Sequence, residues 1–378
     1  MQQAKSDHKY RESGVKRTVP FRDLRVTDAA VRNRLLDAFD TVLRHGRLVM
    51  GPEVESLEQQ VADRCGRRHA VAVSSGSDAL FLALKSVQIG PGDEVITTSL
   101  SWIATANAIA MTGATPVFAD ISKDLNIDPG SVARMIGSRT KAIVPVHFTG
   151  KVCRMQEFSE LATAHGIMIV EDAAQAFGAR HQGRMSGSVG EISCFSMNPM
   201  KVLGACGEAG VVTTDREDVY ERLIMLRYNG IVEKERCVET SLNYRVDTVQ
   251  AAVLLTRLED LESNISRRRE IASRYSERLA AVVDVPQETD DEWDCYYTYT
   301  IQADRRDELK AFLAASGIET KIQHPVLMPH QAPYVDCPRA PIPTAERLVQ
   351  RILCIPANEK LDPTDVEYVA DCILEFYG

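Results

Sequence analysis

Short apolar runs alternate with amphipathic segments between about residues 69 and 215. The run at 167–170 is apolar throughout, whereas the segments between such runs repeat their apolar residues at helical spacing. We predict strands at 69–73, 94–98, 115–119, 141–146, 167–170, 192–196 and 210–214, and helices at 78–87, 102–111, 131–136 and 154–165. Strands that are apolar on both faces and alternate with helices are typical of a mostly parallel sheet, here of seven strands, covered on both sides.

The chain beyond residue 248 has a different pattern. From 248 to 283 the apolar residues keep a helical period, and the segment is heavily charged after Ser266, which predicts one long helix leading out of the first domain. We predict a strand at 296–303, a helix at 307–315, a strand at 318–322 and two closing helices. The chain then divides into a flexible N-terminal arm at 1–20, a large α/β domain at 21–255 and a smaller C-terminal α/β domain at 256–378.

Length, charge and cysteine content narrow the class of protein. The 378 residues suit two domains, and a net charge of −9 with scattered Lys and Arg argues against nucleic acid as the main partner. No apolar run approaches the roughly 18 residues of a membrane span, and the polar N-terminus does not look like a secretory signal. The nine cysteines are spread without a Cys-x-x-Cys pair, which favours free thiols in a reducing cytoplasm.

A turn of small residues follows the predicted strand at 69–73. It reads Ser74-Ser75-Gly76-Ser77-Asp78 and leads into a helix that Ser77 or Asp78 could cap. The exposed amides and the dipole of a helix N-terminus bind phosphate well. Taken alone, the turn is more typical of a capped helix with no ligand, because such caps are common.

Asp172 follows directly on the apolar strand at 167–170, so its carboxylate is expected at the carboxyl edge of the sheet. A carboxylate buried there is unfavourable unless a cation or hydrogen bonds meet it, and a protonated pyridine nitrogen is one such cation. The alternative is an aspartate that only caps the next helix.

Lys201 lies in a glycine-flanked loop after the short strand at 192–196. Its apolar neighbours Met200, Val202 and Leu203 are unusual for a surface lysine, and partial burial favours the neutral amine that Schiff-base chemistry requires. The alternative is a solvated surface charge. The segment Asn243-Tyr244-Arg245 indicates by itself only a loop before a helix.

With these motifs in this order, the chain resembles the sugar aminotransferases of the DegT/DnrJ/EryC1/StrS family, which have the aspartate aminotransferase type of fold. The resemblance runs from about Gly51 to the C-terminus. It is carried by Gly51-Pro52-Glu53-Val54, Ser75-Gly76-Ser77-Asp78-Ala79-Leu80, Glu171-Asp172-Ala173-Ala174-Gln175, the loop at 195–210, Asn243-Tyr244-Arg245, and His324-Pro325 with His330. Two departures flank Lys201: Ser-Met-Asn-Pro-Met-Lys stands where many members have aromatic residues, and Glu208-Ala209-Gly210 replaces a common Asp-Gly-Gly.

The resemblance implies a pyridoxal 5'-phosphate (PLP) enzyme with no metal. It implies that Lys201 binds the cofactor covalently, that Asp172 pairs with the pyridine nitrogen and that Gln175 lies near the ring hydroxyl. It assigns Trp102 to stacking on the ring and Asn243 to the phosphate of the neighbouring subunit's cofactor, so the active sites of a homodimer are shared. It places around the phosphate Ser196, Gly76, Ser77 and Asp78, and near the substrate His147, Tyr244, Arg245 and His324.

The implied reaction is transfer of the amino group of L-glutamate onto a keto-sugar in the cytoplasm. The acceptor stays open between a nucleotide-linked keto-sugar, a keto-sugar phosphate, an aminocyclitol precursor and an 8-oxo octulosonate. Sugar dehydratases related to the family carry His in place of the lysine, and Lys201 argues against that branch. A PLP-binding protein without turnover, and an α/β enzyme without PLP, are the alternatives from other classes.

Overall fold

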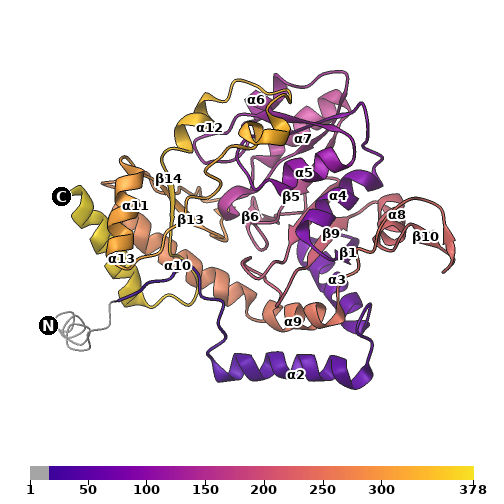
Figure 1. Ribbon diagram of the computed structural model, residues 1–378, viewed down its shortest axis with the longest axis horizontal. Helices are drawn as coiled ribbons and strands as arrows, with labels where there is room; N and C mark the ends of the chain where they lie inside the picture. Colours follow the sequence, from indigo (N-terminus) through magenta and orange to yellow (C-terminus); the bar gives the residue numbers. More distant parts are fainter. Residues whose placement is uncertain (1–16) are drawn as a thin grey trace.

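A seven-stranded sheet forms the centre of the larger part of the chain in the computed structural model, which describes residues 17–378 (Figure 1). The strand order is β1-β9-β8-β5-β4-β2-β3, and only the pairs that β9 forms with β1 and β8 are antiparallel. The strands are β1 (His69–Val73), β2 (Glu94–Thr98), β3 (Thr115–Ala119), β4 (Thr140–Val144), β5 (Met168–Asp172), β8 (Ile192–Ser196) and β9 (Gly210–Thr214). The predicted α/β class with a mostly parallel sheet is confirmed.

Helices cover both faces of this sheet. In β1, Val71 and Val73 join one apolar core while Ala70 and Ala72 join the other, as the two-residue period of a strand requires. The first core includes residues of α4 (Gly76–Ser86), α5 (Ala104–Met111) and α8 (Glu217–Arg227). The second includes residues of α3 (Pro52–Cys65), α6 (Pro129–Ala133), α7 (Met155–His165) and α9 (Thr248–Leu258).

The single long helix predicted over 248–283 is wrong. The structure has two helices, α9 and α10 (Leu261–Leu279), separated at Glu259 and Asp260. Asp260 leaves the helical ladder at φ −95° and ψ 0°, and both carboxylates bind Arg34 of α2 (Ala29–His45). Leu258 and Leu261 are buried on either side of the break at a spacing of three, so the apolar period continues through it and could not reveal it.

The smaller C-terminal domain is built on a two-stranded antiparallel sheet of β13 (Tyr299–Gln302) and β14 (Ile352–Ile355), packed against α10, α11 (Arg306–Ala315) and α13 (Pro363–Tyr377). The strand predicted at 318–322 is wrong, because only isolated bridges occur there, from Ile318 to Val19 and from Lys321 to Cys354. The remaining elements are α12 (Pro343–Leu348), β6 (Arg180–His181), β7 (Arg184–Met185), β10 (Ile231–Val232), β11 (Arg236–Cys237), β12 (Glu292–Trp293), and the 3₁₀ turns η1 (Phe148–Gly150), η2 (Met328–His330) and η3 (Ala332–Tyr334).

The N-terminal segment belongs to the small domain where it is described. Residues 1–16 of the predicted flexible arm lie outside the described residues. Val19 is fully buried in the core of the C-terminal domain and exchanges backbone hydrogen bonds with Gly317 and Glu319, so the arm cannot extend as far as residue 20. Within residues 17–378, no helix has both the length and the apolar composition of a membrane span.

Candidate active site

A cavity of about 560 Å³ opens where the carboxyl ends of β5 and β8 meet the start of α4. Eight of the residues predicted from the sequence lie together in its wall, from segments far apart in the chain. They are Gly76, Ser77, Trp102, Asp172, Gln175, Ser196, Lys201 and His324. Parallel strands bring their carboxyl ends to one edge of a sheet, which is why residues so distant in sequence converge here.

Lys201 is held by a tightly bonded loop after β8. Its backbone N–H donates to the carbonyl of Asn198 at 2.8 Å, and the loop is closed by Met197 and Ala205. The ammonium lies 4.5 Å from the ring centre of Tyr297. It makes no hydrogen bond or carboxylate pair with any residue in 17–378, so the amine is available to a ligand in the cavity.

Asp172 is a buried carboxylate without a cation bonded to it in the described chain. It is 3% exposed and accepts hydrogen bonds from the Thr105 hydroxyl at 2.8 Å and the Ala174 amide at 3.2 Å. Burial raises the pKa of Asp172 above its ordinary value, and these two neutral donors offset only part of that effect. A positively charged group bound in the cavity would stabilise the ionised carboxylate.

The adjacent Glu171 points to the other face of the strand, and its pKa is shifted in the opposite direction from that of Asp172. Its carboxylate accepts hydrogen bonds from the backbone amides of Gly187, Val189 and Gly190, and from the Ser193 hydroxyl. Burial alone would raise its pKa, but His147 and these donors outweigh burial and lower the pKa to about 2. Glu171 is therefore a fixed anion that anchors the loop at 187–190.

The structure does not bring His147 to the cavity, which corrects its prediction as a substrate residue. The ring is fully buried: its Nδ1 accepts from the Cys153 amide at 3.1 Å, and its Nε2 lies 2.8 Å from Glu171. Since Nδ1 is an acceptor, Nε2 carries the proton and donates to Glu171. A ring with both nitrogens bonded and no exposed surface cannot reach a substrate.

Replacing Glu171 with Gln should lower the free energy of unfolding by about 3 kcal/mol, because the amide nitrogen would face buried N–H donors. Urea unfolding measures the loss. The matched control is Glu217→Gln, whose carboxylate pairs with Arg68 and His69 at the surface and should change stability by less than about 1 kcal/mol. Because folding lowers the pKa of Glu171, the carboxylate stabilises the folded state fully at pH values above the ordinary pKa of glutamate. This stabilisation is lost as the pH falls towards 2. Equal losses in the two variants would contradict this role.

The turn before α4 is capped by Ser75 rather than by the predicted Ser77 or Asp78. The Ser75 hydroxyl accepts from the Asp78 amide, and the Asp78 carboxylate in turn accepts from the hydroxyls of Ser74 and Ser75. Asp78 does not line the cavity, because its carboxylate is turned into this network. The amides of Gly76 and Ser77, in the first turn, have no acceptor within the helix.

Gly76 permits a close contact between the start of α4 and the end of β8. A Cβ atom at position 76 would lie 2.4 Å from the Cβ of Ser196, closer than two carbons can approach. The contact places the Ser196 hydroxyl beside the open amides of the helix N-terminus. Amides and hydroxyls converging on a helix N-terminus form a cradle suited to a phosphate group.

The small domain supplies a wall of the cavity that sequence analysis largely missed. Tyr297, Lys321 and Gln323 line it, and Gln323 donates to the side-chain oxygen of Gln175 at 3.2 Å. His324, on the same wall, was predicted from the sequence. Burial, together with the charges of Lys321 and Lys201, lowers the pKa of His324 to about 3, so its ring is neutral. Tyr297 and Lys321 lie in segments predicted only as strands, where alternation shows two faces without indicating which one meets a ligand, and Gln323 directly follows the second of these segments.

Asn243, Tyr244 and Arg245 lie outside the cavity formed by this chain. Their backbone continues the sheet beside β1: Arg245 bridges Val73, and the Tyr244 carbonyl accepts from the Ser74 amide. The Asn243 side-chain oxygen accepts from Arg245 at 3.0 Å. A contact of Asn243 with a neighbouring subunit stays a prediction.

Comparison with known proteins identifies the class. The chain is 35% identical over 366 residues to the "Pleiotropic regulatory protein" of Geobacillus stearothermophilus (95% of this chain, 98% of that one). It is 39% identical over 363 residues to the dTDP-3-amino-3,4,6-trideoxy-alpha-D-glucose transaminase of Streptomyces venezuelae (95% and 96%). Further relatives are named as enzymes for UDP-, dTDP- or GDP-linked sugars.

Solved structures agree with this class. The structure of DesV from S. venezuelae matches with a TM-score of 0.92 at 39% identity, covering 95% of this chain and 98% of that one. NtdA from Bacillus subtilis, solved with its cofactor PMP, matches with a TM-score of 0.88 at 27% identity, covering 95% and 85%. The fold and the site define a PLP-dependent transaminase. The chain belongs to the DegT/DnrJ/EryC1/StrS aminotransferase family, whose profile matches residues 30–374.

The residues present fit PLP. The amine of Lys201 is unpaired among the described residues, and Asp172 is a buried carboxylate that a ring cation would stabilise. The close contact that Gly76 permits sets an open helix N-terminus beside the Ser196 hydroxyl, which suits the phosphate. These three features match the aldehyde, the pyridine nitrogen and the phosphate of the cofactor.

Proposed function

We propose that this transaminase moves the amino group of L-glutamate onto a nucleotide-linked keto-sugar in amino-sugar biosynthesis. The observation that carries the proposal is the convergence of Lys201 and Asp172 in one cavity beside a phosphate cradle. The sugar part rests on the named activities of relatives such as the transaminase of S. venezuelae.

The proposed roles follow from the position of each side chain. PLP, when bound, supplies an electron sink for the bond that breaks at the amine-bearing carbon. Asp172 keeps the ring nitrogen protonated and so maintains that sink. Lys201 would hold the cofactor, and its freed amine would act first as the base that takes the proton from the amine-bearing carbon and then as the acid that returns it.

Four further side chains position the cofactor in this proposal. Gln175 is held by the Thr149 amide at 3.0 Å as well as by Gln323, so its orientation beside the ring hydroxyl is fixed. Trp102 is 61% exposed with its ring 5.7 Å from His324, and it is free to cover the ring of the cofactor. Ser77 and Ser196 supply hydroxyls to the phosphate.

The direct experiment separates the two halves of the reaction. The PLP-loaded protein is mixed with L-glutamate, and the change of cofactor absorbance is followed together with the release of 2-oxoglutarate. The aminated protein is then offered a panel comprising nucleotide-linked keto-sugars, a keto-sugar phosphate, an aminocyclitol precursor and an 8-oxo octulosonate. Stoichiometric 2-oxoglutarate followed by turnover with a nucleotide-linked member supports the proposal. Absence of 2-oxoglutarate would leave a PLP-binding protein without turnover.

We also propose that the protein is a homodimer that works in the cytoplasm. Helix α2, beneath α9 in Figure 1, exposes Leu36, Phe39 and Leu43 by 56%, 43% and 56%, and these residues share one helical face. Leu242, next to Asn243, is 64% exposed. Apolar surface of this kind is typical of an interface, and a second copy would cover it. All nine cysteines are free, which suits a reducing compartment.

Asn243→Ala tests the shared site. If Asn243 binds the phosphate in the neighbouring subunit, the variant should bind PLP about tenfold more weakly, as expected for loss of a hydrogen bond to a charged group. Co-expression with a Lys201→Ala copy gives a mixed dimer in which one site has both residues intact and the other has neither. Half of the wild-type activity at limiting PLP is expected from that mixed dimer. Activity no higher than in the Asn243→Ala dimer would place both residues in the same subunit's site.

A further inference from the structure

Lys321 is a cation in the catalytic cavity without a partner in the described chain. Among residues 17–378, Lys201 and Lys321 are the only lysine or arginine side chains that line the cavity, and the proposed function commits Lys201 to the cofactor. The Lys321 side chain is exposed, and its ammonium makes no hydrogen bond or ion pair with any residue in 17–378. By contrast, Lys151 is paired with Glu292 and Lys85 with Glu239.

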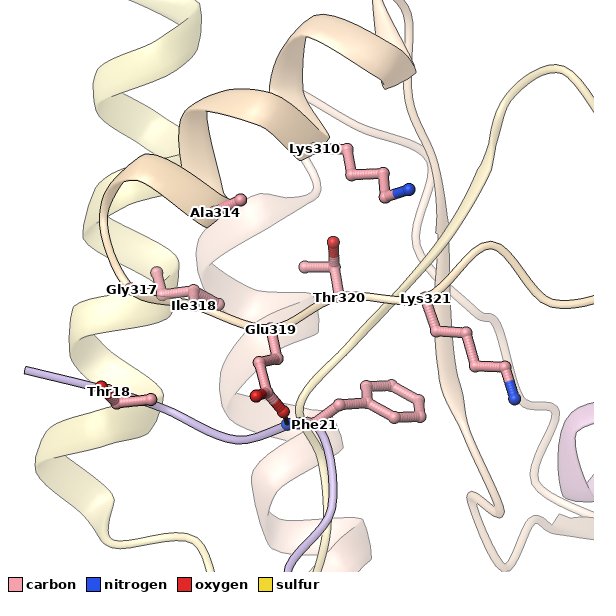
Figure 2. Close-up of a pocket in the computed structure, with 9 residues that line it drawn as sticks. All are labelled: Thr18, Phe21, Lys310, Ala314, Gly317, Ile318, Glu319, Thr320 and Lys321. Atoms are coloured by element: carbon pink, nitrogen blue, oxygen red, sulfur yellow. Dashed lines mark hydrogen bonds between the residues drawn. The ribbon is translucent and has the colours of Figure 1, made fainter.

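The backbone fixes Lys321 in place. Its N–H donates to the carbonyl of Cys354 in β14 at 3.0 Å, and the Cys354 N–H donates back at 2.8 Å. Figure 2 shows the side chain extending away from Glu319 and from Lys310, its neighbours in an adjoining hollow. The ammonium is therefore directed by the small-domain sheet rather than by a surface ion pair.

The charge of Lys321 acts on the groups around it. Burial raises the pKa of Tyr297, but the cations of Lys201, Arg22 and Lys321 outweigh burial and lower it below the ordinary value. Lys321 also adds to the effect of burial in lowering the pKa of His324. This wall of the cavity thus has a positive potential, which a bound anion would relieve.

His324 provides a second unsatisfied group on the same wall. Its ring is neutral, and its Nε2 is buried without a hydrogen-bond partner among the described residues. A buried polar atom without a partner is unfavourable, and a ligand oxygen can accept from it when Nε2 carries the proton. The carboxylate of Glu208, bonded to Asn198 at 2.6 Å, also lines the cavity and would repel an anion placed beside it.

We infer that Lys321, together with His324, binds an oxyanion of the substrate and so determines which substrates enter. The inference rests on the proposed function. The oxyanion is a carboxylate of the amino donor or an anionic group of the acceptor, and these two sources share the same chemistry. Lys321 is a specificity residue in this account and takes no part in proton transfer.

The experiment compares three variants of the PLP-loaded protein in two arms. Lys321→Met removes the charge and keeps an unbranched side chain one atom shorter, Lys321→Arg restores the charge, and Lys310→Met is the matched control from the adjoining hollow. The donor arm measures the L-glutamate concentration that half-saturates the first half-reaction. The same arm includes calorimetry of the binding of glutarate, which has the carboxylates of the donor but no amine and therefore cannot react. The acceptor arm measures binding of UDP-glucuronate, which carries a carboxylate and a diphosphate, to the aminated protein.

Lys321→Met should weaken one arm by about tenfold to a hundredfold, as for loss of a hydrogen bond to a charged group, and leave the maximal rate within about threefold. Lys321→Arg should recover most of the loss, and Lys310→Met should show none. A loss confined to L-glutamate and glutarate assigns the oxyanion to the donor, and a loss confined to UDP-glucuronate assigns it to the acceptor. If Lys321→Met changes neither the half-saturating L-glutamate concentration, nor glutarate binding, nor UDP-glucuronate binding, the inference is overturned. The proposed function still stands in that case, provided that the wild-type protein converts L-glutamate. A wild-type protein that converts no L-glutamate defeats the proposed function instead.

Discussion

Lys201→Ala is expected to reduce amino transfer by about 10⁴-fold or more, because the same amine holds the cofactor and carries the proton. The backbone of the loop should be unaffected, since Lys201 is held there through its N–H to Asn198 and its side chain bonds to no described residue. The measurement is the rate of 2-oxoglutarate formation at saturating L-glutamate and PLP. The visible absorbance of the covalently held cofactor should disappear with it.

Lys201→Arg is the matched control for charge. Arginine keeps a cation near Tyr297 but has no amine that can deprotonate, so it should be as inactive as alanine. Activity above a few per cent of wild type in either variant would contradict the role of Lys201. Loss of folding is checked by the unfolding midpoint, which should match that of the wild type.

Asp172→Asn is expected to slow the glutamate half-reaction by about 10²- to 10⁴-fold, the range typical of a lost electrostatic or acid–base contribution. Asparagine has the same shape; its oxygen can accept from the Ala174 amide, and its NH2 group can donate to the Thr105 hydroxyl, which now accepts. It cannot supply the negative charge that keeps the ring nitrogen protonated. Burial raises the pKa of Asp172 in the absence of a cation, so the ring cation and the carboxylate should stabilise each other.

Stopped-flow absorbance with L-glutamate and with its α-deuterated form measures this effect. The isotope effect should be retained or enlarged in Asp172→Asn, because removal of the proton becomes more strongly rate-limiting. PLP should still bind, more weakly, through the cradle at Gly76 and Ser196. A half-reaction within about threefold of wild type would refute the role assigned to the carboxylate.

The central sheet could be predicted because its strands are short apolar runs bounded by turns. Five of the seven strands, including β1 and β8, begin and end where the sequence pattern placed them. Helix α2 was not predicted from the sequence. It buries only Val42 in this chain, so its apolar residues do not form the core-facing stripe by which an amphipathic helix is recognised. The break at Asp260 was hidden because apolar spacing continues across it.

The candidate site was predictable where a residue follows a strand of the parallel sheet. That rule places Asp172 in the cavity. Ser196 and His147, which only the family resemblance singled out, also lie at or beyond strand ends, but only Ser196 reaches the cavity. His147 also lies beyond a strand end, but it pairs with Glu171, on the opposite face of β5 from Asp172. Strand ends locate an edge of the sheet, whereas the two-residue alternation decides which side chain reaches the cavity.

The contribution of the small domain could not be predicted from local patterns. Tyr297, Lys321 and Gln323 reach the cavity because the two domains pack together around it, and each lies in a segment with no motif of its own. Only His324, carried by the family resemblance, indicated that this part of the chain faces the site. The positions of such residues in the cavity depend on tertiary packing, which the sequence pattern does not encode.

The most direct measurement locates the cofactor on the chain. The PLP-loaded protein is reduced with borohydride, digested and analysed by mass spectrometry. We expect one pyridoxyl adduct, on the peptide that contains Lys201, and its loss when the protein is first treated with excess L-glutamate. An adduct on another lysine, or no adduct at saturating PLP, would contradict that expectation.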